Sequence, residues 1–433
     1  MISYDDALPN FAHIVQKALA EDDISQQIFL RDANGRLTFV KTAVLSEPAE
    51  ETILTGAKRL APWVDPSMPI IALEDMLEPP SVILSQAFPE YIESSIFTGY
   101  LRVIERRLVG QDWLRYPADP EPGLPPIVVF ASHKGGVGRS TALSIAAHAI
   151  SDQGHNVLVI DLDLEAPGLG TMLLSDADLP EGGALDFFVE TSIQNSNRRF
   201  AEKIIASRTN GRGIIHVVPA TGKKSHEFPQ NVLGKIARAY LETIDDENKL
   251  FTFLDRTRQL VKFLCDIGEY DVILIDSRAG LNEATAASML GLGANILLFG
   301  VNTPQTFSGY RFLLSYLSRF RPEKSGENDW RARLRMVQAR AQLHRGSEKS
   351  FRDRAYDLFS DTLYDEEEGI DVDAFNYDYD DSAAPHYAWA VAEDSNYSEF
   401  DPRDHPEQLA QHLYERGFGV FIKNLIDLIG LNR

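Results

Sequence analysis

The sequence predicts an α/β protein in which a small α+β domain precedes a doubly wound, mostly parallel sheet. Apolar runs typical of buried parallel strands recur at 127–130, 156–160 and 271–275, separated by segments with helical periodicity. A glycine-rich loop follows the first run directly, as expected where a strand leads into a helix at a ligand crevice. A proline-rich segment at 116–126 cannot continue a helix, so it is the predicted connector between two domains.

Residues 1–115 are predicted to form the α+β domain. Apolar residues repeat at helical spacing over 8–19, and Asn34-Gly35 between two apolar runs predicts a hairpin. The spacing of apolar residues over 93–110 predicts a final helix. No group of residues in this domain has the pattern of a catalytic site, so we expect a regulatory or partner-binding module.

Residues 127–433 are predicted to form the larger domain, in which strands and helices alternate as in a doubly wound sheet. We expect strands at 127–132, 156–162, 213–219, 271–276, 294–300 and 333–340, and helices at 139–152, about 249–266 and 304–320.

The segment 131–141 is predicted to bind phosphate. Glycines at 135, 136 and 138 let the backbone curl with its N–H groups pointing inward, and the following helix adds the positive end of its dipole. A nucleotide β-phosphate fits such a loop.

The loop Lys134-Gly135-Gly136-Val137-Gly138-Arg139-Ser140-Thr141 resembles the deviant Walker A motif (K-G-G-x-G-K-[ST]) of the ParA/MinD group of P-loop ATPases. The resemblance implies that all eight residues bind the nucleotide, that ATP and Mg²⁺ are the ligands, and that the protein is an ATP-dependent homodimer. Lys134 would reach across the dimer interface to the partner's nucleotide and act in catalysis. Ser140 would hold Mg²⁺, and Thr141 would contact the α-phosphate.

Acidic residues follow two later strands of the predicted sheet. Asp161-Leu162-Asp163 comes after the apolar run 156–160, and Asp276 ends the run 271–275. The resemblance implies that Asp163 orients or activates the attacking water. It places Asp161 in the magnesium network and makes Asp276 the holder of a magnesium-bound water. Gly280 would donate its backbone N–H to the γ-phosphate.

Two positions depart from the motifs of this family. Arg139 stands where the motif has lysine, and the exchange is not conservative, because a planar guanidinium replaces a compact ammonium. We therefore expect ATP binding with slow hydrolysis. Arg278 stands where relatives commonly carry proline. It either supplies charge in cis to the transition state or pairs with an acid.

Composition limits the remaining choices. No apolar run approaches the ~20 residues needed to span a bilayer, and a single cysteine, Cys265, excludes an intrachain disulfide, so we expect a cytoplasmic protein. A net charge of −22 argues against binding DNA by bulk electrostatics. The arginine-rich stretch 319–354 is nevertheless the candidate surface for nonspecific DNA, with a solvated face or docking of the acidic segment 361–381 as the alternatives. The apolar pattern of 418–429 predicts a helix packed on the sheet rather than a membrane anchor.

The function predicted from the sequence is a Mg²⁺-dependent ATPase that works as a slow dimerisation switch and positions or signals to a protein partner bound by the N-terminal domain. One alternative is a nucleotide-binding scaffold without useful hydrolysis. Another is a bacterial tyrosine autokinase, for which the tyrosines between 377 and 397 are suggestive.

Overall fold

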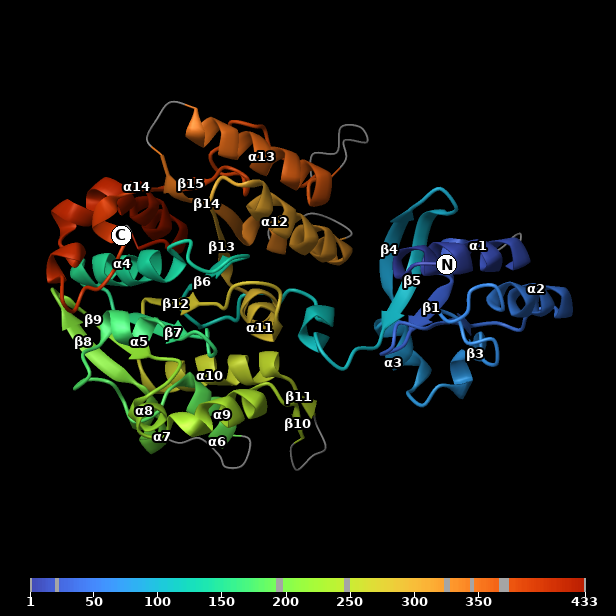
Figure 1. The fold of residues 1–433 in the computed structure, drawn as a ribbon, viewed down its shortest axis with the longest axis horizontal. Helices are drawn as coiled ribbons and strands as arrows, with labels where there is room; N and C mark the ends of the chain where they lie inside the picture. The colour runs from blue at the N-terminus through green and yellow to red at the C-terminus, as the bar shows by residue number, and fades with distance from the viewer. Residues whose placement is uncertain are drawn as a thin grey trace. The chain divides into compact units, whose positions relative to one another are not determined.

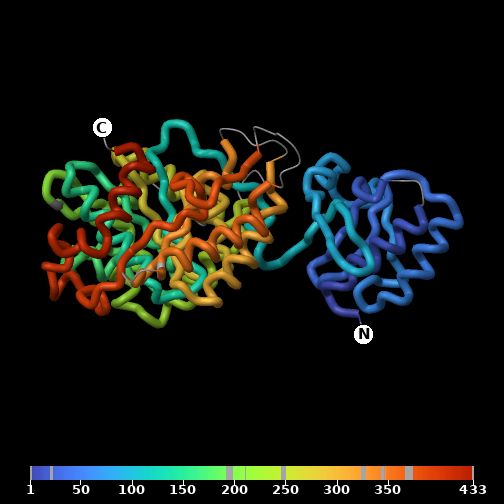
Figure 2. Tube along the Cα trace, turned by 90° about the horizontal axis from the view of Figure 1, so that it is seen from above, coloured from blue at the N-terminus to red at the C-terminus, as the bar shows by residue number. Residues whose placement is uncertain are grey.

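The structure is a computed structural model of the 433-residue chain. It describes residues 2–19, 23–191, 198–244, 250–322, 328–342, 346–365 and 374–431. The chain divides into two compact units, Met1–Leu114 and Arg115–Arg433. Figure 2 traces the first unit in blue, and its strands form a sheet separate from that of the second unit.

The first unit is built on a five-stranded mixed sheet with the order β3-β2-β1-β5-β4. The β1/β2 and β4/β5 pairs are antiparallel, whereas β1/β5 and β2/β3 are parallel. Its elements are α1 (Tyr4–Leu19), β1 (Ile28–Arg31), β2 (Leu37–Lys41), α2 (Glu47–Ala57), β3 (Ile70–Ala72), α3 (Pro80–Ser85), β4 (Phe88–Glu93) and β5 (Thr98–Glu105).

The predicted α+β character, the first helix and the β1/β2 hairpin are present in this unit. The helix predicted over 93–110 is wrong, because this segment holds the end of β4 and all of β5. Leu101 and Val103 belong to the core cluster of α1 and α2, while Ile104 packs in a second cluster. Both faces of the second half of β5 are therefore buried, whereas Ile96, Tyr100 and Leu108, which complete the helix-like spacing in the sequence, are exposed.

The second unit holds an eight-stranded sheet with the order β15-β14-β13-β6-β12-β7-β9-β8. Neighbouring strands are parallel except for the β8/β9 pair at one edge. The strands are β6 (Ile127–Ser132), β7 (Val157–Asp161), β8 (Ala206–Asn210), β9 (Gly213–Val218), β12 (Val272–Asp276), β13 (Asn295–Gly300), β14 (Leu334–Ala341) and β15 (Trp389–Ala392), and a separate short hairpin pairs β10 (Thr243–Ile244) with β11 (Leu250–Phe251).

Helices cover both faces of this sheet, which confirms the predicted doubly wound fold (Figure 1). The helices α4 and α14 pack against each other and against one face, in a core that includes Phe130, Phe299 and Phe421. Helix α10 contacts α11, and α12 contacts α13. The helices are α4 (Arg139–Asp152), α5 (Leu169–Leu173), α6 (Ala184–Glu190), α7 (Arg198–Ile204), α8 (Lys223–Glu227), α9 (Val232–Ala239), α10 (Phe253–Ile267), α11 (Glu283–Gly291), α12 (Pro304–Leu317), α13 (Ser347–Thr362) and α14 (Gln411–Ile429).

The apolar face of α14 is buried, as the sequence predicts. Phe421 is 0% exposed and lies against the rings of Phe130, Phe299 and Trp389 at centroid distances of 6.1, 5.8 and 6.2 Å. Among the described residues, no helix has the length and hydropathy needed to cross a membrane. The terminal pattern is therefore explained by packing on the sheet.

A buried histidine makes the stability of the second unit depend on pH. His386 is fully buried, its Nδ1 lies 2.5 Å from the Tyr364 hydroxyl, and its Nε2 lies 3.0 Å from the Tyr379 carbonyl oxygen. Burial lowers the pKa of His386, and Arg335 and Arg352 act in the same direction. The neutral imidazole is therefore the form that the fold stabilises.

We expect His386 to make an unfavourable contribution to the stability of this unit as the pH falls from 7.5 to 5.5, opposite in sign to that of Asp161, whose raised pKa lies in the same interval. The unfolded chain takes up a proton near pH 6.5 and the native His386 does not, so up to about 1.4 kcal/mol is lost across this interval. Urea unfolding of the full chain at both pH values measures the effect. Replacing His386 by glutamine should remove this contribution, so acidification should change the free energy of unfolding more favourably in the variant than in the parent chain. Replacing the exposed His405 should leave the pH dependence of the parent chain unchanged. Equal pH dependence in both variants would contradict the assignment.

Candidate functional site

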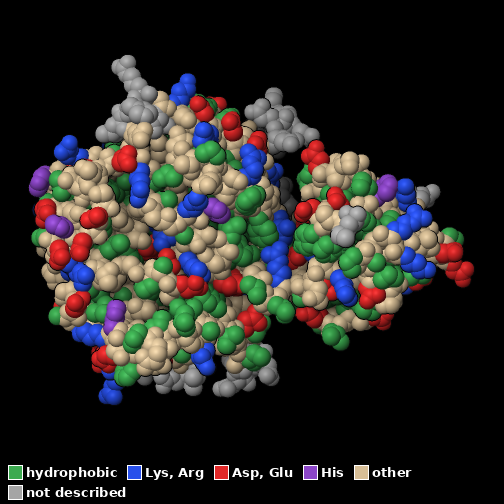
Figure 3. All heavy atoms as spheres, viewed as in Figure 1, with side chains coloured by type: hydrophobic (Ala, Val, Ile, Leu, Met, Phe, Trp, Pro, Cys, Tyr) green, Lys and Arg blue, Asp and Glu red, His purple; other side chains and the backbone are tan. Residues whose placement is uncertain are grey.

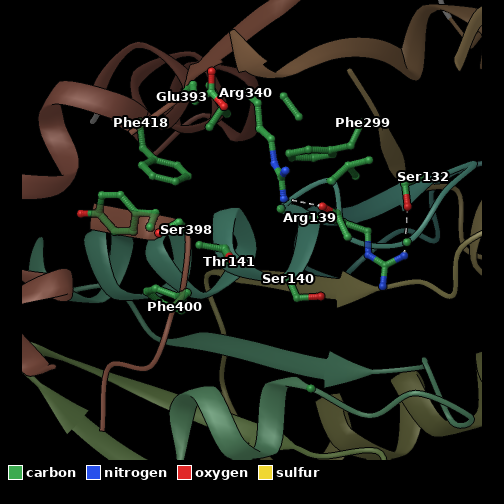
Figure 4. A pocket seen from close by; sticks show the side chains of 18 of the residues that line it. Ser132, Arg139, Ser140, Thr141, Phe299, Arg340, Glu393, Ser398, Phe400 and Phe418 are labelled. Carbon is green, nitrogen blue, oxygen red and sulfur yellow. Dashed lines mark hydrogen bonds between the residues drawn. The ribbon is translucent and has the colours of Figure 1, made fainter. Parts of the chain in front are cut away.

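A cavity of about 740 Å³ opens beside the loop that joins β6 to α4. The loop residues 135–141 form one wall, and Figure 4 shows the side chains that complete it. The opposite part of the cavity is lined by segments after β14 and β15 and by Phe418 of α14. The site thus lies at the carboxyl ends of parallel strands, where open α/β sheets bind ligands.

The backbone of the loop has the conformation that the phosphate-binding prediction requires. Gly136 and Gly138 have φ angles of +73° and +90°, which residues with a side chain rarely adopt. A Cβ at either position would meet no atom within 4 Å, so backbone conformation rather than space explains the glycines. Gly138 caps α4, and the first N–H groups of this 14-residue helix lack helical partners. The loop can therefore hold an anion with backbone donors.

Arg139 is buried and paired with two acidic residues of the site. Its Nε donates to Asp276, its Nη2 lies 3.1 Å from Asp163 Oδ2, and its Nη1 lies 3.3 Å from the Ser132 hydroxyl. Burial alone would lower the pKa of Arg139, but the two carboxylates outweigh it and raise that pKa. The guanidinium is therefore charged and neutralises acids that lie at the ends of β7 and β12.

Asp161 organises the loop that carries Asp163. One carboxylate oxygen accepts the N–H of Asp163 at 3.0 Å, and the other accepts those of Gly168 and Leu169, both at 3.1 Å. Burial, followed by repulsion from Asp276, raises the pKa of Asp161 to about 7. The sequence assigns Asp161 to a magnesium network, whereas in the structure both of its oxygens accept backbone N–H groups.

The donor set expected for Mg²⁺ is present at Ser140 and Asp276. The Ser140 hydroxyl donates to Asp276 Oδ2, so a hydroxyl and a carboxylate oxygen lie side by side at the foot of the loop. Hard oxygen donors of this kind suit Mg²⁺, which is usually held by one or two carboxylates together with substrate phosphates and water. These two residues fit the ion. The other Asp276 oxygen is already bound by Arg139.

The remaining site residues predicted from the sequence differ in their exposure and in the groups that they contact. Lys134 is exposed, outside the cavity lining, and its Nζ contacts Gln305 of α12. Thr141 lines the cavity. Gly280 donates its N–H to the Ser132 carbonyl at 3.0 Å, so a γ-phosphate would have to replace this bond. Arg278 forms an ion pair with Glu165, as expected if it pairs with an acid rather than supplying charge to the transition state.

Sequence reasoning missed one side of the cavity. The strand β15 was not predicted, and the segment that follows it contributes Tyr397, Ser398 and Phe400 to the lining. Arg340, at the end of β14, was assigned to the arginine-rich stretch 319–354 and not to this site. A usable signal was present, because the short apolar run 389–392 is followed by Glu393-Asp394-Ser395, the same pattern as a buried strand that ends in acids.

The stretch 319–354 does not form one basic face. Arg331 is fully buried and paired with Asp329 and Asp365, and Arg335 is buried and donates to the carbonyls of Ala383 and Ala384. The proposed DNA surface is wrong for these arginines, because their charges satisfy buried acceptors inside the fold. On the face drawn in Figure 3, basic and acidic side chains are interspersed.

The acidic segment 361–381 is described only in part, since 366–373 lie outside the described residues. Within the described part, Asp365 binds Arg331 and Asp380 binds Arg352. Some docking of this segment on the arginine-rich stretch is therefore observed.

Residues 126–326 match a family model described as an AAA domain. The span includes the loop at 134–141, Asp161, Asp163, Asp276 and Gly280. The resemblance to ParA/MinD-like P-loop ATPases that the sequence predicts is carried by the same part of the chain. A search of curated proteins finds no match to this sequence.

Three solved structures illustrate the range of structural similarity. The pNOB8 ParA protein, in a structure bound to nonspecific DNA, is 20% identical, with a TM-score of 0.43 over 72% of this chain and 100% of that one. The cell division ATPase MinD of Pyrococcus furiosus is 18% identical, with a TM-score of 0.40 over 70% of this chain and 100% of that one. The kinase domain of the Escherichia coli tyrosine kinase ETK is 20% identical, with a TM-score of 0.31 over 44% of this chain and 62% of that one. At such low values the fold assignment rests on the strand order and the family model.

Proposed function

We propose that the protein is an ATP-binding, slowly hydrolysing dimerisation switch of the ParA/MinD type, built on residues 126–326, which match a family model described as an AAA domain. The observation that carries the proposal is the loop at 134–141, with two glycines at positive φ, opening on a cavity of about 740 Å³. A cavity of this size accommodates a ligand as large as a nucleotide.

Each part of the site has a distinct task in this proposal. The loop N–H groups and the start of α4 bind the phosphates, while Tyr397, Phe400 and Phe418 provide an apolar end for the base. Asp163, close to the loop, orients the attacking water. Ser140 and Asp276 would hold Mg²⁺, which supplies charge stabilisation to the phosphates when bound.

The pairing of Asp163 with Arg139 accounts for slow turnover. A carboxylate that orients water must accept a hydrogen bond from that water, and Asp163 Oδ2 already accepts one from Arg139 at 3.1 Å. The same guanidinium binds Asp276. Arg139 therefore competes with the attacking water for the Asp163 carboxylate, whereas nucleotide binding to the backbone of the loop does not depend on this ion pair.

The same observation favours a second candidate function, a nucleotide-binding scaffold without useful hydrolysis. If Arg139 keeps both acids paired when the nucleotide is bound, the site binds but does not turn over. In either case we assign the protein partner to the first unit, which lacks a site pattern of its own. The arginine-rich stretch 319–354 is not part of the proposal, since its central arginines are buried.

The test is the solution mass of the full chain by light scattering, with Mg²⁺-ADP and with a slowly hydrolysed ATP analogue. We expect the mass to rise from 48.4 kDa to about twice that value with the analogue alone. Lys134→Ala should prevent the rise, because the exposed Lys134 is the group assigned to the partner's nucleotide. Lys349→Ala, which removes another exposed lysine, should leave it intact. A mass that does not respond to the analogue would reject the switch.

Phosphate release separates the two candidate functions. If the protein hydrolyses ATP, Asp163→Ala should lower the rate by about 10²–10⁴-fold, the usual contribution of a positioned acid–base group. Nucleotide binding without measurable phosphate release in the parent protein would favour the scaffold.

A further inference from the structure

Arg340 has an unusual backbone conformation at the edge of the cavity. Its φ is +49°, and among the described non-glycine residues it is the one with positive φ. It lies where the pairing of β14 with β15 shifts register between Gln338 and Ala341. A non-glycine residue in this region carries a backbone cost that persists only where the surroundings impose it, and such residues cluster at ligand sites.

The side chain of Arg340 extends over the phosphate-binding loop. Its Nη2 donates to the Gly136 carbonyl at 2.7 Å, and Figure 4 shows it entering the cavity between Phe418 and Phe299. A carbonyl oxygen is a neutral acceptor, so this bond leaves the positive charge uncompensated. Among the described residues, no ion pair joins Arg340 to a carboxylate.

The two basic residues that line the cavity differ in availability. Arg139 is buried and already bound to Asp163 and Asp276. Arg340 is exposed and its acceptor, the Gly136 carbonyl, is neutral, so an approaching anion does not have to displace an opposite charge from its guanidinium. An anionic ligand entering the cavity therefore meets the guanidinium of Arg340 as the available charge.

We propose that Arg340 binds the phosphate chain of a nucleoside di- or triphosphate held on the loop, exchanging its bond to the Gly136 carbonyl for bonds to phosphate oxygens. The proposal rests on the proposed function, because it needs the nucleotide to occupy the loop. It assigns to Arg340 the positive charge that Arg139 cannot offer while paired with Asp163 and Asp276. The register shift and the positive φ of Arg340 then represent local backbone strain that is needed to direct this side chain toward the ligand.

Arg340→Gly is the variant that separates this role from a structural one. Glycine adopts φ near +49° without strain, so the melting temperature should stay at or above that of the parent chain. The phosphate contact is lost at the same time, so ADP and the slowly hydrolysed ATP analogue should bind about 10- to 100-fold more weakly by calorimetry. Arg340→Gln, which keeps a polar side chain without the charge, should weaken both nucleotides similarly. Arg416→Ala, which removes an exposed arginine of α14, is the matched control.

A purely structural role for Arg340 gives the opposite pair of results. Arg340→Gly would then lower the melting temperature and leave the affinity for both nucleotides within about twofold of the parent value, an outcome that overturns the proposal. A parent chain that binds neither nucleotide overturns the proposed function, and this inference with it. Nucleotide binding that is equal in the parent and both variants overturns the inference alone.

Discussion

Replacing Arg139 by alanine is expected to lower the free energy of unfolding of the second unit by about 3–5 kcal/mol, the range found when one partner of a buried ion pair is removed. The side chain is 8% exposed, and its partners Asp163 and Asp276 are 11% and 2% exposed. The variant would leave two carboxylates without a counter-charge, Asp276 buried and Asp163 at the edge of the cavity. An unpaired buried carboxylate either destabilises the folded state through its lost hydration or becomes neutral by taking up a proton. Urea unfolding of the full chain measures the loss.

A double variant tests whether the loss comes from the unpaired acids. Arg139→Ala combined with Asp276→Asn removes one of the two uncompensated charges, so it should recover part of the stability. Arg416→Ala should change the free energy of unfolding by no more than about 0.5 kcal/mol, as expected for an exposed arginine. If the double variant is as unstable as the sum of its single variants, the ion-pair network does not explain the effect.

Phe421→Ala is expected to cost a similar amount, about 3–5 kcal/mol, the range for truncating a fully buried aromatic residue. Phe421 is 0% exposed, and its ring lies against Phe130 of β6, Phe299 of β13 and Trp389 of β15. Truncation leaves a cavity between α14 and three strands, which the surrounding side chains can fill only in part. Urea unfolding of the full chain again provides the measurement.

The neighbouring residue on the same helix provides the control. Val420 is 66% exposed, so Val420→Ala should change the free energy of unfolding by no more than about 0.5 kcal/mol. A small effect at both positions would mean that α14 does not belong to the core. The difference in the free energy of unfolding between the two variants shows whether the apolar face of α14 packs on the sheet or is free to bind another surface.

The parts of the fold and site that follow from local sequence were predictable. Buried parallel strands produce continuous apolar runs, and the loop glycines are required by local backbone conformation, so 127–132 and the residues after it could be placed without tertiary information. The acids at the ends of β7 and β12 were predictable for the same reason. Their partners were not, because a sequence does not show that Arg139 turns toward Asp276 rather than toward the cavity.

Features that depend on distant contacts were missed. In the segment 98–105, two clusters bury Leu101, Val103 and Ile104 on opposite faces of the strand, and such a short apolar run does not distinguish a strand from a helix. Arg331 and Arg335 appear in the sequence as surface charges, yet buried acceptors bind them. The four-residue strand β15 is too short for a periodic signal, although the segment after it completes the cavity.

The strand order of the second unit has a consequence for the way the protein is made. The strand β6, which leads into the loop, pairs with β12 and β13, and both are synthesised far later than β6. Phe130 of β6 is covered by Phe421 of α14, the last helix of the described chain. While the ribosome is still translating, the first unit has all of its strands and can fold, but β6 must wait for its neighbours with its apolar side chains uncovered. The nucleotide loop therefore reaches its final form only after β12, β13 and α14 have been synthesised, and until then the apolar side chains of β6 stay uncovered.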